Sequence, residues 1–289
     1  MKIKENIKIF FELTKIRITS FVTVTTAFGF IAASGTISLD IFPVLFGVLF
    51  LAFGSAALNH YQEKDFDAMM DRTKNRPIPS GKISAVKSLF LAGSLILVGS
   101  LILIIGSNII AFSLGMLNLI WYNFIYTLLK RKTPFAIVPG SLVGAIPPVI
   151  GWTAAGGSLF DPQILAIAFF FFIWQIPHFW LLLLVMDKDY QQAGFPTLTS
   201  IFSREQLRRI TFIWIISTAV TGFMITLFGA VTDIWISIAL FASCLWLTWK
   251  AFKLLSDQEN FLIYRLTFGY INYFALFVVF LISIDKLIL

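Results

Sequence analysis

The chain has 289 residues, of which 58% are hydrophobic, 32 are Phe and only 13% are charged. Charged residues make up about 25% of an ordinary soluble domain, so this composition excludes a soluble globular protein and indicates a membrane protein. The net charge of +7 would suit a nucleic-acid ligand, but the distribution of the basic residues along the chain explains it differently.

Apolar stretches long enough to cross a hydrocarbon layer of ~30 Å, roughly 20 residues each, recur along the whole chain. The sequence therefore predicts an all-α polytopic membrane protein with nine transmembrane helices. The polar stretches are too short to fold alone, so we expect one integral-membrane domain over residues 1–289. The nine predicted spans are 17–37, 41–62, 84–106, 108–128, 135–155, 162–186, 208–229, 232–252 and 263–284.

Basic residues occupy alternate loops of this nine-span arrangement. They precede span one and follow spans two, four, six and eight, and only Lys286 lies on the opposite side. By the positive-inside rule, the N-terminus is cytoplasmic and the C-terminus is outside. The positive charge then belongs to one membrane face, so we expect the lipid bilayer and no nucleic acid as a partner. The first residues lack a signal-peptide or transit-peptide pattern, which favours a multi-pass protein of the bacterial plasma (inner) membrane.

Polar side chains recur every four residues at the cytoplasmic end of the second span. Residues four apart share a helix face, and carboxylates gathered on one face need a cation among them. Mg²⁺ binds through one or two carboxylates plus substrate phosphates, and arginine forks bind phosphate oxygens. The pattern predicts a magnesium–diphosphate site, with a charged loop capping a helix as the plain alternative. The residues concerned are Asn59, Glu63, Asp67 and Asp71, with Asp65, Arg72 and Arg76 beside them.

Two further segments reach the same face of the membrane. The end of span four carries Tyr126, Lys130 and Arg131, a group that either anchors topology or supplies a cation to a phosphate. The end of span six carries a second charged group, which either faces the first acidic cluster across a cavity or is an ordinary surface loop. That group consists of Asp187, Lys188, Asp189 and Tyr190, before the helix-breaking Gly194 and Pro196.

Polar residues inside the spans are few and therefore informative. His178 follows Pro177 and lies nine residues, or ~13 Å along a helix, from Asp187. It is either a packing residue or a substrate contact. We expect Asn118, Asn123 and Asn272 to form hydrogen bonds between helices.

The segment NHYQEKDFDAMMDRTKNRP, starting at Asn59, resembles the first aspartate-rich motif of the UbiA superfamily of intramembrane prenyltransferases. Within that superfamily, further segments between Leu13 and Leu198 are similar to the protohaem IX farnesyltransferase (haem O synthase) branch. They read LTKIRITSF, YTLLKRKTP, GAIPPVIGW, WQIPHFWLL and KDYQQAGFPTL. The chain departs from the superfamily pattern at Glu63, where Asp is usual, and its second motif lacks two aspartates four residues apart.

The resemblance implies transfer of farnesyl from farnesyl diphosphate to a vinyl group of haem b, with water addition, to give haem O. It implies Mg²⁺ as cofactor, with Glu63, Asp67 and Asp189 as metal ligands and Asn59 beside them as catalytic residues. It also implies downstream partners, namely haem A synthase or terminal-oxidase assembly factors. Two alternatives stay open: prenylation of a quinone-precursor aromatic acid, and a carrier for an anionic substrate.

The residues expected to bind substrate fall into two groups. The diphosphate end of the site draws on basic and polar side chains near the cytoplasmic face. His178 would serve the haem side, because a neutral imidazole can ligate haem iron or hydrogen-bond a propionate. The full expected set is Lys15, Arg17, Asp65, Asp71, Arg72, Arg76, Tyr126, Lys130, His178, Asp187, Lys188 and Tyr190.

Overall fold

The computed structural model describes residues 2–256 and 261–288, and the side chains of Lys2, Asp187 and Lys188 lie outside this description. Helices account for most of the described chain, and it contains no β-strand. The main helices are α1 (Lys2–Leu13), α2 (Ile16–Ser34), α3 (Ile41–Met69), α4 (Ala85–Gly106), α5 (Ile109–Ile120), α6 (Thr127–Leu129), α7 (Ile137–Gly140), α8 (Leu142–Ala154), α9 (Pro162–Gln192), α10 (Arg204–Leu227), α11 (Ile234–Ala251) and α12 (Phe261–Ile288). Short 3₁₀ or π segments join or extend them: η1 (Trp121–Tyr126), η2 (Pro134–Ala136), η3 (Leu198–Ser200) and η4 (Phe252–Leu255).

Nine helical segments of the described residues are long and apolar enough to cross a membrane, which confirms the predicted nine-span, all-α architecture. Span four runs through α5, η1 and α6, span five through η2, α7 and α8, and span eight through α11 and η4. Large apolar side chains such as Phe90, Ile105 and Phe160 are exposed on the outside of the bundle. In a bilayer such side chains contact hydrocarbon, so they do not require a further protein partner.

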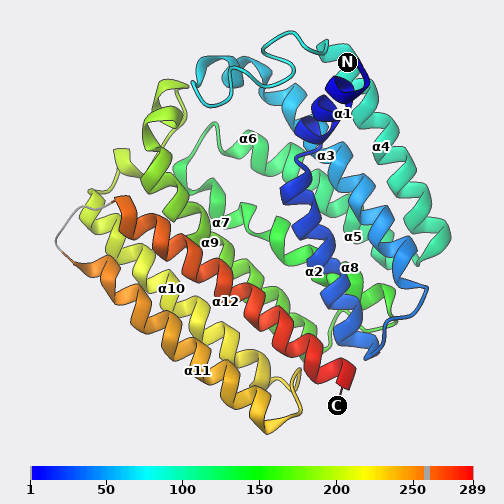
Figure 1. Cartoon of the computed structure of the whole chain (residues 1–289), viewed down its shortest axis with the longest axis vertical. Coiled ribbons are helices and arrows are strands. Elements are labelled where there is room, and N and C mark those ends of the chain that lie inside the picture. The colour runs from blue at the N-terminus through cyan, green and yellow to red at the C-terminus, as the bar shows by residue number, and fades with distance from the viewer. Residues whose placement is uncertain (1, 257–260, 289) are drawn as a thin grey trace.

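The helices form two packed groups (Figure 1). In one group α2 packs against α3 and α8, α3 against α4, and α5 against α4 and α8. In the other, α9, α10, α11 and α12 pack against one another. Contacts of α8 with α9 and of α2 with α12 join the two groups. Each group has its own buried hydrophobic cluster.

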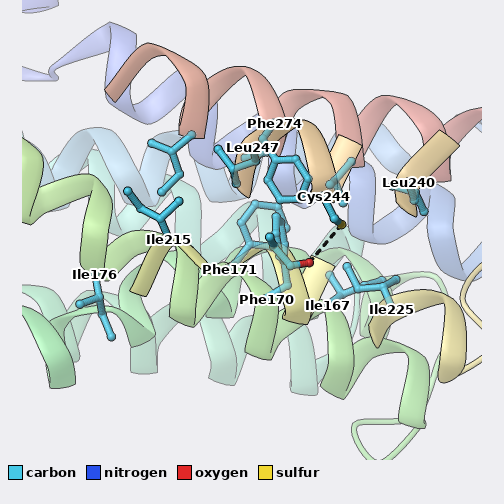
Figure 2. Packing of buried hydrophobic residues seen from close by; sticks show 14 of the residues in the cluster. Ile167, Phe170, Phe171, Ile176, Ile215, Ile225, Leu240, Cys244, Leu247 and Phe274 are labelled. Carbon is cyan, nitrogen blue, oxygen red and sulfur yellow. Dashed lines mark hydrogen bonds between the residues drawn. The ribbon is translucent and has the colours of Figure 1, made fainter. Parts of the chain in front are cut away.

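The larger hydrophobic cluster lies mainly in the second group and includes Phe28, Ala32 and Trp152 of the first (Figure 2). The rings of Phe170 and Phe274 meet edge to face at 6.0 Å between centroids. Cys244 is buried and free, and its Sγ donates a hydrogen bond to the carbonyl oxygen of Ala219 at 3.1 Å. This cysteine therefore has a packing role, as its place within an apolar span suggests.

Two helices extend past the predicted membrane spans. The predicted spans end at residues 62 and 186, but α3 continues to Met69 and α9 to Gln192. Local helix propensity explains both extensions, because neither segment contains Gly or Pro before those ends. The first acidic motif therefore lies on a rigid helix as far as Asp67, and α9 ends just before Gly194, which has φ +74°.

Helices α2 and α8 approach so closely that glycine is required on both sides. A Cβ atom built on Gly29 would lie 1.9 Å from the carbonyl oxygen of Pro148, and one on Gly151 would lie 1.9 Å from that of Thr26. Both neighbours are backbone atoms, which cannot rotate away. Residues of α2 and α8 line the central cavity, so this close contact fixes part of the cavity wall.

We expect Gly151→Ala to destabilise the protein by about 1–3 kcal/mol, because the added methyl group must push two helix backbones apart. The matched control is Gly93→Ala in α4, where nothing lies within 4 Å of the added Cβ. Thermal unfolding in detergent should show a lower Tm for Gly151→Ala and an unchanged or slightly raised Tm for Gly93→Ala. Equal Tm values for the two variants would contradict the close contact.

Candidate active site

A cavity of about 450 Å³ lies between the two helix groups, lined mainly by α2, α3, α5, α8 and α9. Its lining changes character along α3, from Val48 and Leu51 to Glu63 and Asp67 over roughly five helical turns. The cavity therefore has an apolar end and a charged end. We call the charged end the mouth; it is lined by Lys15, Asn59, Glu63, Asp67, Arg72, Arg76, Tyr126, Lys130 and Tyr190.

The polar residues predicted as a stripe along one face of the second span are Asn59, Glu63, Asp67 and Asp71. The structure places some of them in the cavity and others on the outside of the protein. Asn59, Glu63 and Asp67 are buried and line the cavity, in keeping with their spacing of four residues. The side chains of Asp65 and Asp71 are 82% and 72% exposed, and they pair with Lys64 at 3.8 Å and Lys74 at 2.6 Å. Asp65 lies on another face of the helix, and Asp71 comes after the end of α3. Only the first three residues of the predicted stripe therefore meet in one site.

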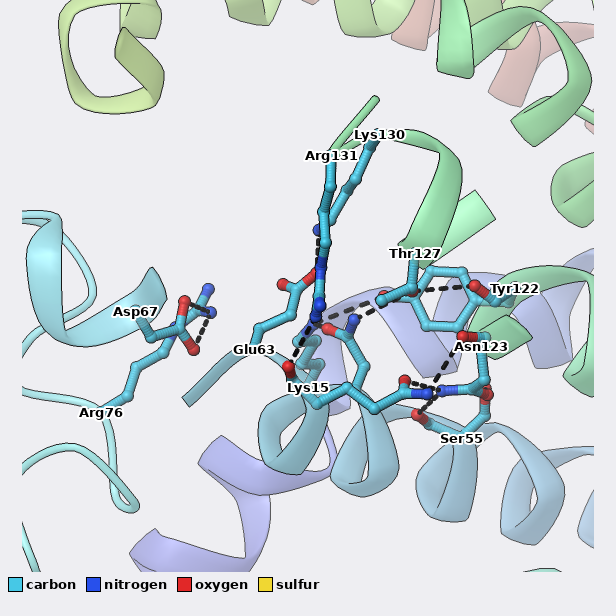
Figure 3. Close-up of polar contacts among 12 residues, drawn as sticks. Lys15, Ser55, Glu63, Asp67, Arg76, Tyr122, Asn123, Thr127, Lys130 and Arg131 are labelled. Atoms are coloured by element: carbon cyan, nitrogen blue, oxygen red, sulfur yellow. Dashed lines mark hydrogen bonds and ion pairs between the residues drawn. The ribbon is translucent and has the colours of Figure 1, made fainter. Parts of the chain in front are cut away.

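Each buried carboxylate of the mouth is paired with a basic side chain from a neighbouring loop (Figure 3). Arg76 Nη1 donates to both oxygens of Asp67, at 2.7 and 2.8 Å. Glu63 forms an ion pair with Lys130. A buried carboxylate without such a partner would be strongly destabilising. The pairing also brings two cations to a point where the oxygens of an anionic substrate can bind them.

Lys15 reaches the mouth from the turn between α1 and α2. Its Nζ donates to Asn59 Oδ1 at 2.6 Å, and it is the only described non-glycine residue with positive φ (+49°). Burial lowers the pKa of Lys15 to about 8, and the Glu63 carboxylate only partly offsets that effect. A strained backbone that holds a partly desolvated ammonium group at a cavity is typical of a binding site. Arg17, the other basic residue predicted here, is exposed and lies outside the described cavity lining.

The charged segment at the end of α9, residues 187–190, contributes fewer side chains to the cavity lining than α3 does. Asp189 Oδ2 lies 3.7 Å from Arg72 Nε, so this carboxylate sits near the rim beside a lining residue. Tyr190 lines the cavity and packs against Phe195 at 5.9 Å between ring centroids. The predictions for Asp187 and Lys188 concern side chains outside the described residues.

The π-helical segment η1 shapes one wall of the site. Tyr122 and Tyr126 line the cavity with their rings stacked at 5.9 Å, and Lys130 Nζ lies 5.8 Å from the Tyr126 ring centroid. Asn123, which follows Tyr122, is fully buried and bonds to both Ser55 and Gln62 of α3. The sequence reasoning missed Tyr122, although its spacing of four from Tyr126 was the available signal. Nothing in the pattern indicated the π-helical turn.

The carboxylates suit a magnesium ion only together with a substrate. Among the described side chains, which do not include that of Asp187, no group of three or more His, Cys, Asp or Glu is gathered closely enough to hold a metal. The three predicted ligands Glu63, Asp67 and Asp189 therefore do not converge on one point. Glu63 and Asp67 do face one cavity, and one or two carboxylates completed by phosphate oxygens match the usual Mg²⁺ arrangement.

His178 lies against α12 instead of the cavity. Its Nδ1 forms a hydrogen bond with Asn272 Oδ1 at 2.8 Å, and its ring packs on Phe268 and Trp174. Its neighbours Gln175 and Phe179 line the cavity, whereas His178 is outside the described lining. In this structure the histidine is therefore a partnered residue between two helices, and the haem-side role expected for it has no geometric support.

Comparison with known proteins places this geometry in a family. Residues 20–280 match the model of the UbiA prenyltransferase family. A protein from Pseudoalteromonas atlantica named protoheme IX farnesyltransferase 2 is 37% identical over 279 residues, covering 95% of this chain and 90% of its own. A protoheme IX farnesyltransferase from Oleidesulfovibrio alaskensis is 30% identical over 280 residues, covering 96% of each chain.

Solved structures show the same fold at low sequence identity. A digeranylgeranylglyceryl phosphate synthase structure matches with a TM-score of 0.80 and 16% identity, over 99% of this chain and 100% of that one. A UbiA homologue from Archaeoglobus fulgidus, bound to GPP and Mg²⁺, matches with a TM-score of 0.69 and 16% identity, over 95% and 99% of the two chains. The chain is a multi-pass membrane enzyme that belongs to the UbiA prenyltransferase family.

Proposed function

We propose that this protein transfers the farnesyl group of farnesyl diphosphate to a vinyl group of haem b, with addition of water, to give haem O. The observation that carries the proposal is the two-ended cavity. Its cation-rich mouth suits a diphosphate, and its apolar remainder suits an isoprenoid chain. Haem b as the acceptor, in place of a quinone precursor, rests on the names of the full-length relatives.

The mouth is suited to neutralising the leaving diphosphate. Arg76 and Lys130 are held beside the cavity by Asp67 and Glu63, and Lys15 and Arg72 lie in the same lining. Charge-assisted contacts from such groups stabilise the negative charge that develops as the allylic C–O bond breaks. Mg²⁺, held by Glu63 and Asp67 together with the phosphates, would add Lewis-acid stabilisation of the same charge.

The rest of the lining is suited to protecting an allylic carbocation. The stacked rings of Tyr122 and Tyr126 line the cavity beside Lys130, where their faces can stabilise positive charge. Apolar side chains around the chain-binding part limit the access of bulk water. No covalent bond to the protein is needed in this reaction.

The distribution of basic residues supports a position for the site relative to the membrane. Basic residues gather at the end of the bundle where the mouth lies, so we place the mouth near the cytoplasmic face of a bacterial plasma membrane. Haem O leaves the site as a membrane-soluble product, and its natural recipients are haem A synthase or terminal-oxidase assembly factors.

The test of the proposal is incubation of the purified protein with Mg²⁺, farnesyl diphosphate and haem b. Mass spectrometry of the extracted haem should show addition of one farnesyl group and one water. Parallel reactions with a quinone-precursor aromatic acid should leave the acid unchanged. Prenylation of the acid with haem b untouched would assign the chain to the other branch of the family.

We expect Asp67→Ala and Glu63→Ala each to lower turnover by at least roughly 100-fold, because each change removes a metal ligand and frees a buried cation. The matched control is Asp65→Ala, a change from the same helix at a side chain that is 82% exposed. Farnesylated haem formed per minute, at saturating Mg²⁺, is the measurement. Near-normal rates in both cavity variants would remove the metal assignment.

We expect Arg76→Lys to raise the apparent KM for farnesyl diphosphate by roughly tenfold, because the charge stays but the planar fork is lost. The KM for haem b should stay within about twofold. A rise in the haem KM alone would mean that this end of the cavity binds the acceptor.

The pKa of Lys15 predicts a pH dependence of diphosphate binding. A lysine with pKa about 8 is charged below that pH and neutral above it, so affinity for the diphosphate should fall as pH rises through about 8. In Lys15→Arg the side chain stays charged, since arginine has a pKa above ~12. The KM for farnesyl diphosphate measured across this pH range should therefore rise in the wild type and stay flat in the variant. Parallel profiles would show that another group titrates.

A further inference from the structure

The apolar end of the cavity is closed by a floor of buried side chains. Along α3 the lining reaches Val48, whereas Val44, one turn further, is only 1% exposed and lies outside the described lining. Along α5 the lining reaches Gly115, whereas Ala111, one turn further, is fully buried and also lies outside it. Val44, Val48 and Ala111 belong to the hydrophobic cluster of the first helix group, together with Leu103 of α4. Two helices therefore place the floor independently at the same cluster.

The depth of the cavity below the mouth matches one isoprenoid length. Asn59 marks the mouth, where its Oδ1 accepts a hydrogen bond from Lys15, and Val48 lies eleven residues before it on α3. Eleven residues of α-helix span ~16 Å. Carbon–carbon bonds of ~1.5 Å give an extended farnesyl chain a length of roughly 14 Å, against roughly 9 Å for geranyl and roughly 19 Å for geranylgeranyl. A farnesyl chain that starts at the mouth therefore ends at the floor.

Gly115 keeps the floor open, because it contributes no side chain. A Cβ atom at position 115 would lie 2.9 Å from Leu51 Cδ1 and 3.2 Å from Leu103 Cδ1. Leu103 is fully buried in a close-packed cluster, so it can move little. Leu51 lines the cavity, so it yields toward the cavity when it moves. A larger residue at position 115 would therefore take its volume from the floor.

We infer that Gly115, with Val48 and Leu51, selects the length of the isoprenoid chain; this inference rests on the proposed function and deepens it. A farnesyl chain buries its last isoprene unit against these three residues, whereas a geranyl chain leaves that space unfilled and loses the burial. A geranylgeranyl chain is too long for the closed end, so its diphosphate would be held away from the cations of the mouth. Chain length thus decides whether the carbon bonded to the diphosphate lies beside Lys15 and Asn59 when the far end of the chain reaches the floor.

The test is the preference of the enzyme between donors of different length. In Gly115→Leu the added side chain fills the floor, so farnesyl diphosphate should lose the burial of one isoprene unit while geranyl diphosphate still fits. We expect the ratio of kcat/KM for geranyl diphosphate to that for farnesyl diphosphate to rise at least roughly 100-fold. The matched control is Gly93→Leu in α4, where the glycine is exposed and nothing lies within 4 Å of the added Cβ. In this control the ratio should keep its wild-type value.

Val48→Ala tests the same floor in the opposite direction and from the other helix. Removing the branched end of the side chain deepens the cavity, so the use of geranylgeranyl diphosphate relative to farnesyl diphosphate should rise roughly tenfold. This variant keeps the inference testable if Gly115→Leu does not fold. Binding of unreactive thiolodiphosphate analogues of each chain length should show the same preferences without turnover.

A wild-type donor preference in a folded and active Gly115→Leu, or in Val48→Ala, would overturn the inference. A change in the haem KM with the donor preference unchanged would also overturn it, because the acceptor would then occupy this end of the cavity. Absence of prenylated haem from the wild type with every donor would instead refute the proposed function, and binding of the analogues would still report on the floor.

Discussion

The pairing of two buried carboxylates with two cations at the cavity mouth is the interaction on which the site depends. Asp67 holds Arg76 and Glu63 holds Lys130, and each cation comes from a loop that follows a helix end. Carboxylates and cations buried separately would each be strongly unfavourable. Because they are buried together, the loops after α3 and α6 are drawn over the cavity, and the cations face the place where a diphosphate would bind.

Hydrogen bonds between α3 and the segments around residues 121–131 hold this pair of ion pairs in place. Asn123 bonds to Ser55 and Gln62, so it fixes η1, with Tyr122 and Tyr126, against α3. Arg131 lies outside the described cavity lining and donates to the carbonyl oxygen of Gln62 at 2.7 Å. Two neighbouring basic residues therefore have different roles. Lys130 lines the cavity, whereas Arg131 joins the loop after α6 to α3.

Much of this could be predicted from the sequence because the signals are periodic. Long apolar runs identified nine spans, and the spacing of Asn59, Glu63 and Asp67 identified one face of a helix. Spacing could not separate Asp71 from that face, because the position at which a helix ends is only weakly encoded locally. Contacts between distant parts of the chain could not be predicted from local patterns. The hydrogen bond between His178 and Asn272, for example, joins residues 94 positions apart. The unpartnered Asn118 could not be distinguished from Asn123, since both are asparagines in the same apolar span.

The π-helical turn at η1 has a consequence for the tolerance of this region to changes in length. A π turn accommodates one residue more than an α turn, and each residue turns an α-helix by ~100° about its axis. Deleting a single residue between Trp121 and Tyr126 would let the span close into an ordinary helix. The following segment would keep its rotation, because the turn loses only the residue that it holds in excess, and Lys130 would still face Glu63. A deletion of one residue within α5 removes no such excess, so it would turn the rest of the span by ~100° and carry Lys130 off the side that faces Glu63, although hydropathy and span length would hardly change.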